Sequence, residues 1–239
     1  MQNIQTQIQA LQKQIDILEQ KDSQIPTYSF SRISFQDLKK LLKIERDFNS
    51  NIFENWFSFK YQFQKSDIEF LEHLIKRNSP LIESYKEEDL KVKMITPILN
   101  RIDFLDFQKG VRDFYEESIT YKTDKFIFSG TTDFLISKGL DFSEKPYFFI
   151  QEFKKSIKND DPRPQLLAEL ISAVELNNWT NINGAYIVGS IWNFVILEKI
   201  GQNSYKYFIS ENFDSTKIED LKNIYKNLLY IKDNILGTD

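Results

Sequence analysis

The sequence contains no cysteine and a single histidine, His73. The absence of cysteine excludes disulfides, thiol catalysis, iron–sulfur clusters and cysteine-based zinc sites. One histidine excludes a histidine-rich zinc site and a chain with several catalytic histidines. Any catalysis must therefore use the side chains of Asp, Glu, Lys, Ser, Thr or Tyr.

The chain also lacks a long apolar run and a strong excess of one charge. No stretch approaches the roughly 18 uncharged apolar residues of a membrane span, and the first residues do not resemble a signal peptide. We therefore expect a cytoplasmic protein without a membrane partner. The net charge of −4 and the isoelectric point near 5.3 exclude a uniformly basic surface that coats nucleic acid. A local basic cleft is compatible with these values.

The residues that are abundant indicate a folded chain. Of the 239 residues, 41% are hydrophobic and 15% are aromatic, which is enough for a large core. We expect three parts, a coiled-coil helix over 1–22, a helical extension over 23–80 and a main domain over 81–239.

The amino-terminal segment has a heptad pattern. Its apolar residues are spaced by four and three positions: Ile4, Ile8, Leu11, Ile15 and Leu18. Ile at a positions with Leu at d positions favours parallel dimers. Three heptads are marginal alone, so a helix that folds back onto its own domain is the alternative to a homodimer.

The rest of the sequence predicts alternating helices and strands. Pro26 lies in a polar break at 22–29, and Ser34 is a helix cap for a helix expected to reach about Phe48. A helix is expected over 86–102, kinked by Pro97. Further strands are expected at 113–121, 125–137, 147–154, 184–190, 192–199 and 204–210, and further helices at 67–77, 164–178 and 215–235. This order predicts an α/β or α+β fold with a mixed central sheet flanked by helices.

Acidic and basic residues lie together in two of the expected strands. Glu152 and Lys154 are two positions apart in a strand and therefore share a face. A neighbouring strand can bring Asp133 beside them. Two carboxylates and the carbonyl of Phe153 would form a pocket of hard oxygen ligands, which suits Mg²⁺ or Mn²⁺.

In this pocket Lys154 can orient a water and stabilise charge developing on a phosphate. The alternative without a catalytic role is a solvated Glu–Lys pair on an edge strand. The other acidic-x-Lys pairs of the sequence fall in expected helices, where the two side chains cannot share a face. A glycosidase is disfavoured because it would leave Lys154 without a role.

Four segments together resemble the PD-(D/E)XK nuclease superfamily. The closest similarity is to the nuclease domains at the front of type I restriction enzyme motor subunits, and it covers about residues 81–210. The segments are the helix from Glu87 through Pro97, the strand Gly130-Thr-Thr-Asp133, the strand Ile150-Gln-Glu152-Phe-Lys154-Lys155, and Pro164-Gln165-Leu-Leu-Ala-Glu169.

The resemblance implies a restriction-endonuclease-like fold and a set of roles. Asp133 and Glu152 would hold the metal with the carbonyl of Phe153, and Glu87 would support a second metal or a metal-bound water. Lys154 would act on the water or the transition state, and Gln165 would orient the substrate or Lys154. The sequence departs from the family by having Thr before Asp133 and a bulky Phe153 between Glu152 and Lys154. It also has no phosphate-binding loop of a motor domain.

A local basic run adjoins the acidic site. Lys155, Lys158 and Arg163 could contact the phosphates of a nucleic acid, or they could be a solvated loop, since Asp160 and Asp161 interrupt them. The sequence thus predicts a Mg²⁺-dependent nuclease that acts on DNA. Restriction or defence is the setting that the resemblance implies for it. The alternative is an inactive nuclease-fold protein that binds DNA or serves as a scaffold and dimerises through its first helix.

Overall fold

A computed structural model describes residue 7 and residues 25–156 and 161–237 of the chain. Within these residues, nine strands form one mixed sheet with the order β1-β4-β5-β6-β7-β8-β2, while β3 pairs with β4 and β9 pairs with β7. The pairs β1–β4, β5–β6 and β2–β8 are parallel, and the others are antiparallel.

The strands have the following bounds: β1 Thr27–Ser29, β2 Lys43–Arg46, β3 Val111–Lys122, β4 Ile127–Lys138, β5 Glu144–Lys154, β6 Asn181–Val188, β7 Ile191–Gly201, β8 Ser204–Ile209 and β9 Phe213–Asp214. The helices are α2 Phe35–Leu41, α3 Glu54–Phe57, α4 Lys65–Asn78, α5 Glu87–Leu90, α6 Thr96–Ile102, α7 Pro162–Asn177 and α8 Ile218–Leu236. Shorter turns are η1 Phe30–Arg32, η2 Ser50–Phe53, η3 Ile82–Ser84 and the π-helical turn η4 Lys91–Ile95.

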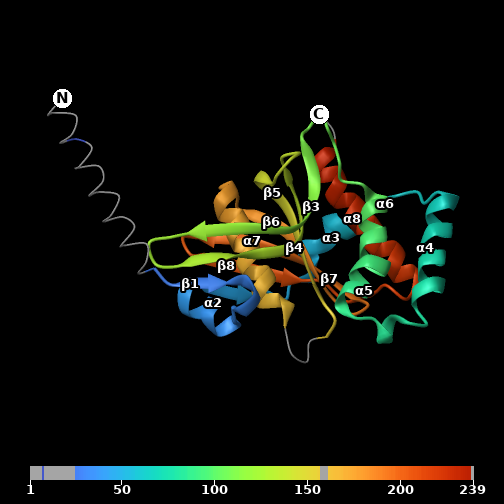
Figure 1. Ribbon diagram of the computed structural model, residues 1–239, viewed down its shortest axis with the longest axis horizontal. Coiled ribbons are helices and arrows are strands. Elements are labelled where there is room, and N and C mark those ends of the chain that lie inside the picture. Colours follow the sequence, from blue (N-terminus) through green and yellow to red (C-terminus); the bar gives the residue numbers. More distant parts are fainter. Residues whose placement is uncertain (1–6, 8–24, 157–160, 238–239) are drawn as a thin grey trace.

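Helices cover both faces of the sheet (Figure 1). On one face, α4, α6 and α8 close a core that contains Phe149 and Phe153 of β5. On the other face, α2 and α7 close a second core that contains Ile150 of the same strand. Because β5 is buried on both faces, it reads as a continuous apolar run in the sequence.

This architecture confirms the predicted α+β fold with a mixed sheet and flanking helices. The predicted coiled coil over 1–22 lies outside the described residues, apart from residue 7. No helix among the described residues has the length and apolar character needed to cross a membrane.

The helix expected from Ser34 to Phe48 is shorter than predicted. Ser34 does cap α2 through a reciprocal capping box with Asp37, but the helix ends at Leu41. Residues Lys43–Arg46 form β2, which runs parallel to β8 with Ile44 buried opposite Tyr205. The apolar spacing of residues 41–44 fits either a helix or a strand. The segment forms a strand because the edge of β8 is available to pair with it.

The polar break at 22–29 also contains a strand that the sequence did not predict. Residues Thr27–Ser29 form β1, which pairs in parallel with Ile127–Ser129 of β4. The segment expected as a helical extension over 23–80 therefore contributes two strands to the sheet. Three-residue strands carry too short a pattern to be recognised from periodicity.

The helix predicted over 86–102, with a kink at Pro97, is divided into three parts in the structure. It consists of α5, the π-helical turn η4 and α6, with Pro97 in the first turn of α6. Proline has no N–H to donate to the preceding turn, so the wider hydrogen-bonding pattern of η4 accommodates it. Such π-helical turns are frequent at functional sites, and here Lys91 begins the turn.

The helix α7 is buried along most of its length against β5 and β6. Asp161 caps it by accepting a hydrogen bond from the backbone N–H of Arg163, and two prolines occupy its first turn. The helix packs closely on the sheet because β6 has a glycine, Gly184, beneath Leu170. This close packing places Gln165 and Glu169 of α7 over the end of β5.

We predict that Gly184→Ala destabilises the protein by about 1–3 kcal/mol. The added Cβ would lie 2.9 Å from the carbonyl oxygen of Ile150 and 2.9 Å from a methyl of Leu170, so the helix or the strand must shift. Urea unfolding followed by circular dichroism measures the change. Gly201→Ala is the matched control, since its Cβ would meet only Ser204 at 3.7 Å. Equal midpoints for the two variants would contradict the packing argument.

Candidate functional site

The site begins where β4 and β5 separate. The two strands are paired from Lys138 and Glu144 to Phe134 and Gln151, and Asp133 and Glu152 come directly after the last pair. Because β3 pairs with one edge of β4 on both sides of Asp133, β1 and β5 share the other edge of β4. Residues 130–133 lie in the interval between them.

Two carboxylates take over the hydrogen bonds that the separating strands no longer form. The backbone N–H of Asp133 donates to Oε1 of Glu152 at 3.3 Å, and the backbone N–H of Phe153 donates to Oδ2 of Asp133 at 2.8 Å. These reciprocal bonds fix both side chains against the two strands. Asp133 and Glu152, which the sequence analysis proposed as a pair, are therefore adjacent.

A second buried acid faces Glu152 from α7. Glu169 and Glu152 are both fully buried, and one oxygen of each, Oε2, meets no hydrogen-bond donor among the described residues. Gln165 lies one turn before Glu169 and donates to its Oε1 at 3.1 Å. Two carboxyls that face each other in a buried site need a shared proton or a cation between them.

The pKa values of these two acids reflect that need. Burial raises the pKa of Glu152 well above its usual range, and the charges of Glu169 and Asp133 raise it further. Burial also raises the pKa of Glu169, although hydrogen bonds from Glu152 and Gln165 oppose the shift. Lys154 lowers the pKa of both acids through its charge. Both shifts favour a proton on the pair when no cation is bound.

Lys91 is a site residue that the sequence analysis missed. Its ammonium donates to Glu116 at 2.5 Å and lies 3.5 Å from Oδ1 of Asp133, and its side chain is only 11% exposed. Burial alone would lower the pKa of Lys91, but the hydrogen bond to Glu116 and the charge of Asp133 raise it. Lys91 therefore stays charged and neutralises Asp133.

Glu116 reaches Lys91 because the backbone of β3 is distorted. It has a φ of 54°, in the left-handed region, and it lies opposite Asp133 at the one position where β3 and β4 are unpaired. A non-glycine residue in this region costs about 1–2 kcal/mol. Backbone strain of this kind gathers at functional sites.

The other predicted site residues lie around this centre at different distances. Oε2 of Glu87 accepts a hydrogen bond from the backbone N–H of Lys155 at 3.1 Å, so Glu87 is held at the end of β5. Arg163 is bound by the carboxylate of Asp161 at 2.7 Å and lies over the ring of Phe35. Its guanidinium is thus already paired with a carboxylate. Lys158 lies outside the described residues.

An open depression of about 530 Å³ adjoins the site. It is lined by Glu88, Lys91, Val92, Thr96, Tyr115 and Glu116. A solvent-borne group can therefore approach Lys91 and the exposed carboxylate of Glu116, whereas Glu152 and Glu169 are fully buried. A larger pocket lies elsewhere in the described part of the chain, at the start of β6.

The oxygen-rich donor set suits a hard cation, and the unpaired Oε2 atoms of Glu152 and Glu169 are available to one. Among the described residues, however, no group of three or more acidic, histidine or cysteine side chains is arranged as a metal site. With Lys91 beside Asp133, the site resembles one in which an ammonium and a shared proton balance three carboxylates.

Comparison with known proteins does not add to this description. No protein-family model and no curated protein matches the chain.

The missed residues differ in how visible they were in the sequence. Glu169 is four positions after Gln165 and Lys91 is four positions after Glu87, so both share a helix face with a residue already proposed. That spacing was a usable signal. Nothing in the sequence marks Glu116, because its role depends on a distorted backbone.

We predict that the stability of the protein falls as pH rises through the pKa of the Glu152–Glu169 pair. The folded pair has a raised pKa, so above the unfolded pKa near 4.5 the folded state binds more protons than the unfolded state. The slope for one proton is about 1.4 kcal/mol per pH unit. Urea unfolding between mildly acidic and mildly basic pH measures it.

Glu169→Gln is the informative variant for this prediction, since it keeps the shape but removes one titrating group. Its stability should fall less steeply with pH than that of the wild type. Groups remote from the pair are common to both proteins, so their contributions cancel in the difference. Parallel curves would show that the pair does not hold a proton in the folded state.

Proposed function

We propose that this protein is a metal-dependent nuclease with a restriction-endonuclease-like fold that hydrolyses phosphodiester bonds of DNA. The supporting observation is the pair Asp133 and Glu152, which is fixed by reciprocal hydrogen bonds where β4 and β5 separate. The mixed sheet with helices on both faces and the Glu-x-Lys strand are consistent with this proposal.

The proposed metal ligands are the carboxylates of Asp133 and Glu152 and the carbonyl of Phe153, with Glu87 as a more distant support. Their oxygen atoms suit Mg²⁺ or Mn²⁺. A bound ion of this kind would polarise a phosphoryl oxygen and lower the pKa of a bound water. Oδ1 of Asp133 becomes available to it when the ammonium of Lys91 moves away.

Lys154 is the residue proposed to act on the attacking water and on the phosphate. It shares a face of β5 with Glu152, and its charge acts on Glu152 and Glu169. A compact ammonium in this position can orient the attacking water and stabilise charge on the phosphate. Gln165 holds Glu169 in place, so its proposed role is to position the buried acids.

Substrate binding in this proposal uses the depression beside Lys91 as the entrance. Lys155 and Lys158, together with Arg163, are the proposed phosphate contacts along the DNA backbone. Arg163 would have to exchange Asp161 for a phosphate. Restriction or defence against foreign DNA in the cytoplasm is the setting we propose, by analogy with the fold.

A second candidate is a nuclease-fold protein without turnover that binds DNA or serves as a scaffold. The ion pair between Lys91 and Asp133 favours it, because an ammonium already balances the charge of this carboxylate. The full burial of Glu152 also restricts access to the site. The two candidates differ in whether the acids bind a divalent ion.

We predict that Lys154→Ala lowers the cleavage rate about 10²–10³-fold while Mn²⁺ binding is retained. Asp133→Asn and Glu152→Gln should lose both cleavage and Mn²⁺ binding, because these carboxylates bind the ion. Lys154 acts on the substrate instead. Nicking of supercoiled plasmid in Mg²⁺, Mn²⁺ or EDTA measures cleavage, and calorimetric titration measures Mn²⁺ binding.

Lys76→Ala is the control for this series, since Lys76 is an exposed cation on α4 that lines neither the acidic site nor the depression beside it. It should cut at the wild-type rate. A wild-type protein that neither binds Mn²⁺ nor nicks DNA would favour the scaffold. Full cleavage by Lys154→Ala would show that another residue acts on the substrate.

We also propose that the protein is a homodimer formed by the heptad segment. The pattern Ile4, Ile8, Leu11, Ile15 and Leu18 is the support for this proposal. Light scattering should give twice the chain mass of 28.4 kDa, and deletion of residues 1–22 should give a folded monomer. A full-length monomer at micromolar concentration would instead indicate that the segment packs on its own chain.

A further inference from the structure

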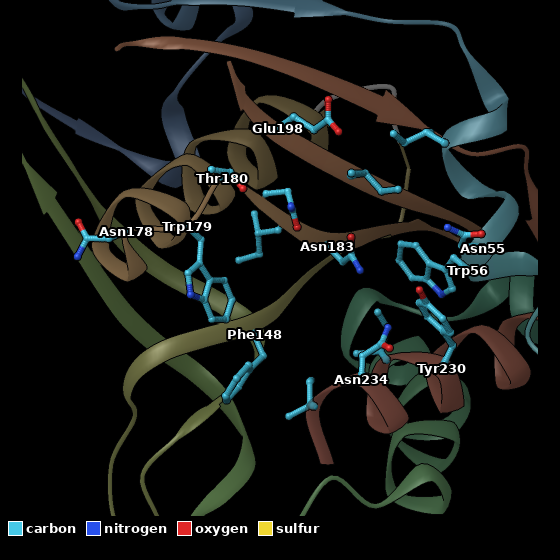
Figure 2. Close-up of a pocket in the computed structure, with 16 residues that line it drawn as sticks. Asn55, Trp56, Phe148, Asn178, Trp179, Thr180, Asn183, Glu198, Tyr230 and Asn234 are labelled. Carbon is cyan, nitrogen blue, oxygen red and sulfur yellow. The ribbon is translucent and has the colours of Figure 1, made fainter. Parts of the chain in front are cut away.

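A second pocket lies away from the acidic site, at the start of β6 and beside the end of α8. Its volume is about 770 Å³, within the range usual for small-molecule sites. Figure 2 shows Phe148 and Trp179 on one side, Trp56 and Tyr230 on the other, and Asn183 between them. Neither the proposed metal site nor the proposed DNA contacts use these residues.

The two sides of the pocket are aromatic pairs. The rings of Phe148 and Trp179 are 5.8 Å apart and tilted by 47°. On the other side, Trp56 and Tyr230 are 6.0 Å apart and nearly stacked, with 24° between their planes. Trp56 is itself buried, with 2% of its surface exposed, and it supports the ring of Tyr230 from behind. The rings open to a ligand are therefore those of Tyr230 on this side and of Phe148 and Trp179 on the other, which are all partly exposed. Such rings suit a flat, apolar-faced ligand.

These walls are held rigidly by the backbone. Ile136 pairs with Phe149 and Ser137 with Tyr147, so Phe148 is the extra residue of a β-bulge in β5. Bulges redirect a side chain from the regular alternation of a strand, and the ring of Phe148 joins the core face that α8 covers.

Trp179 and Trp56 are fixed in other ways. Asn178 ends α7 in the left-handed conformation, and the backbone N–H of Trp179 donates to the carbonyl of Val174 at 2.9 Å. Nε1 of Trp56 donates to the carbonyl of Asn227 on α8 at 2.9 Å. The pocket is thus preformed and needs no ordering when a ligand binds.

The floor of the pocket is polar. Asn181 is the cross-strand partner of Glu198, and Asn183 is the partner of Ile196. Directly opposed side chains have Cβ atoms about 4.5–5.5 Å apart, so an amide and a carboxylate stand side by side. Among the described residues that line the pocket, none is lysine or arginine, and Glu198 is the only ionised group. A phosphate or other anion is therefore disfavoured.

We infer that this pocket binds a nucleobase, either of a free nucleoside or of an unstacked residue in a nucleic-acid strand. Aromatic walls stack on the faces of a base, and amides with a neighbouring carboxylate form hydrogen bonds with its edge. Guanine fits best, because its N1–H and N2–H₂ are parallel donors for the carboxylate of Glu198 and its O6 accepts from an amide.

This inference does not rest on the proposed cleavage activity. Phe148 and Glu152 are four residues apart on β5, which is about 13 Å along a strand. The pocket and the acidic site are therefore separate, and base binding can be tested in a protein that does not cut DNA.

The test is a titration of the full-length protein with deoxyguanosine, deoxyadenosine, deoxycytidine and thymidine, followed by calorimetry and tryptophan fluorescence. Trp179 lines the pocket and is partly exposed, so stacking on its ring should quench its share of the emission. Deoxyguanosine should bind most tightly, and equally at low and high salt, because no cation of the protein contacts it.

Variants locate the binding. Trp179→Ala should weaken it roughly 5- to 100-fold, the loss of one stacked base. Glu198→Gln should remove the preference for guanine while other nucleosides still bind. Trp179→Tyr keeps an aromatic ring and should retain binding. This result would show that the loss of binding in Trp179→Ala is not caused by misfolding. Phe107→Ala, which removes an exposed ring elsewhere, is the control and should bind as the wild type does.

A second arm distinguishes the source of the base. A short oligonucleotide with one guanine among abasic sites should bind more tightly than deoxyguanosine, and weaken with salt, if the natural ligand is a strand. Equal affinities indicate a free nucleoside. The inference is overturned if no nucleoside binds at millimolar concentration, if Trp179→Ala binds like the wild type, or if a neutral oligosaccharide binds and displaces the base.

Discussion

The candidate site depends on two hydrogen bonds that cross between diverging strands. The backbone N–H of Asp133 is bound by Glu152, and the backbone N–H of Phe153 is bound by Asp133. At this point a regular sheet would pair backbone with backbone, and an unpaired buried N–H would cost free energy comparable to a lost hydrogen bond. The carboxylates remove that cost, so β4 and β5 can separate without leaving backbone donors unsatisfied. The same bonds also orient the acids, which links the geometry of the site directly to the integrity of the sheet.

The balance of charge around these acids explains the remaining contacts. Asp133, Glu152 and Glu169 bring three carboxyls into a largely buried region, and isolated buried charges are very unfavourable. Lys91 compensates Asp133 directly, while a proton on the coupled pair compensates Glu152 and Glu169. The strained backbone of Glu116 brings a further acceptor to Lys91. Each contact lowers the electrostatic cost of gathering acids, and a divalent cation would perform the same compensation in another way.

The sequence was most informative where patterns were long. The apolar run of β5 predicted a strand with Glu152 and Lys154 on one face at its end, and the structure has this strand. Short elements were missed because β1 and β2 form only against partners distant in sequence, which periodicity cannot reveal. At the site, helical spacing could have indicated Lys91 and Glu169. The hydrogen bonds of Asp133 and the conformation of Glu116 could not be predicted, since both arise from how three strands meet.

The two amino-terminal strands have a consequence for how the chain assembles. Thr27 pairs with Ile127, and Lys43 pairs with Ser204, so both strands must wait for partners that are made much later. The second separation is roughly 160 residues, which a ribosome adding about 5–20 residues per second translates in about 10–30 s. During this time the segment cannot occupy its place beside β8. Pairings of such long sequence separation also slow folding, so the edge formed by β2 is expected to close last and to be the first part of the sheet exposed when the protein is stressed.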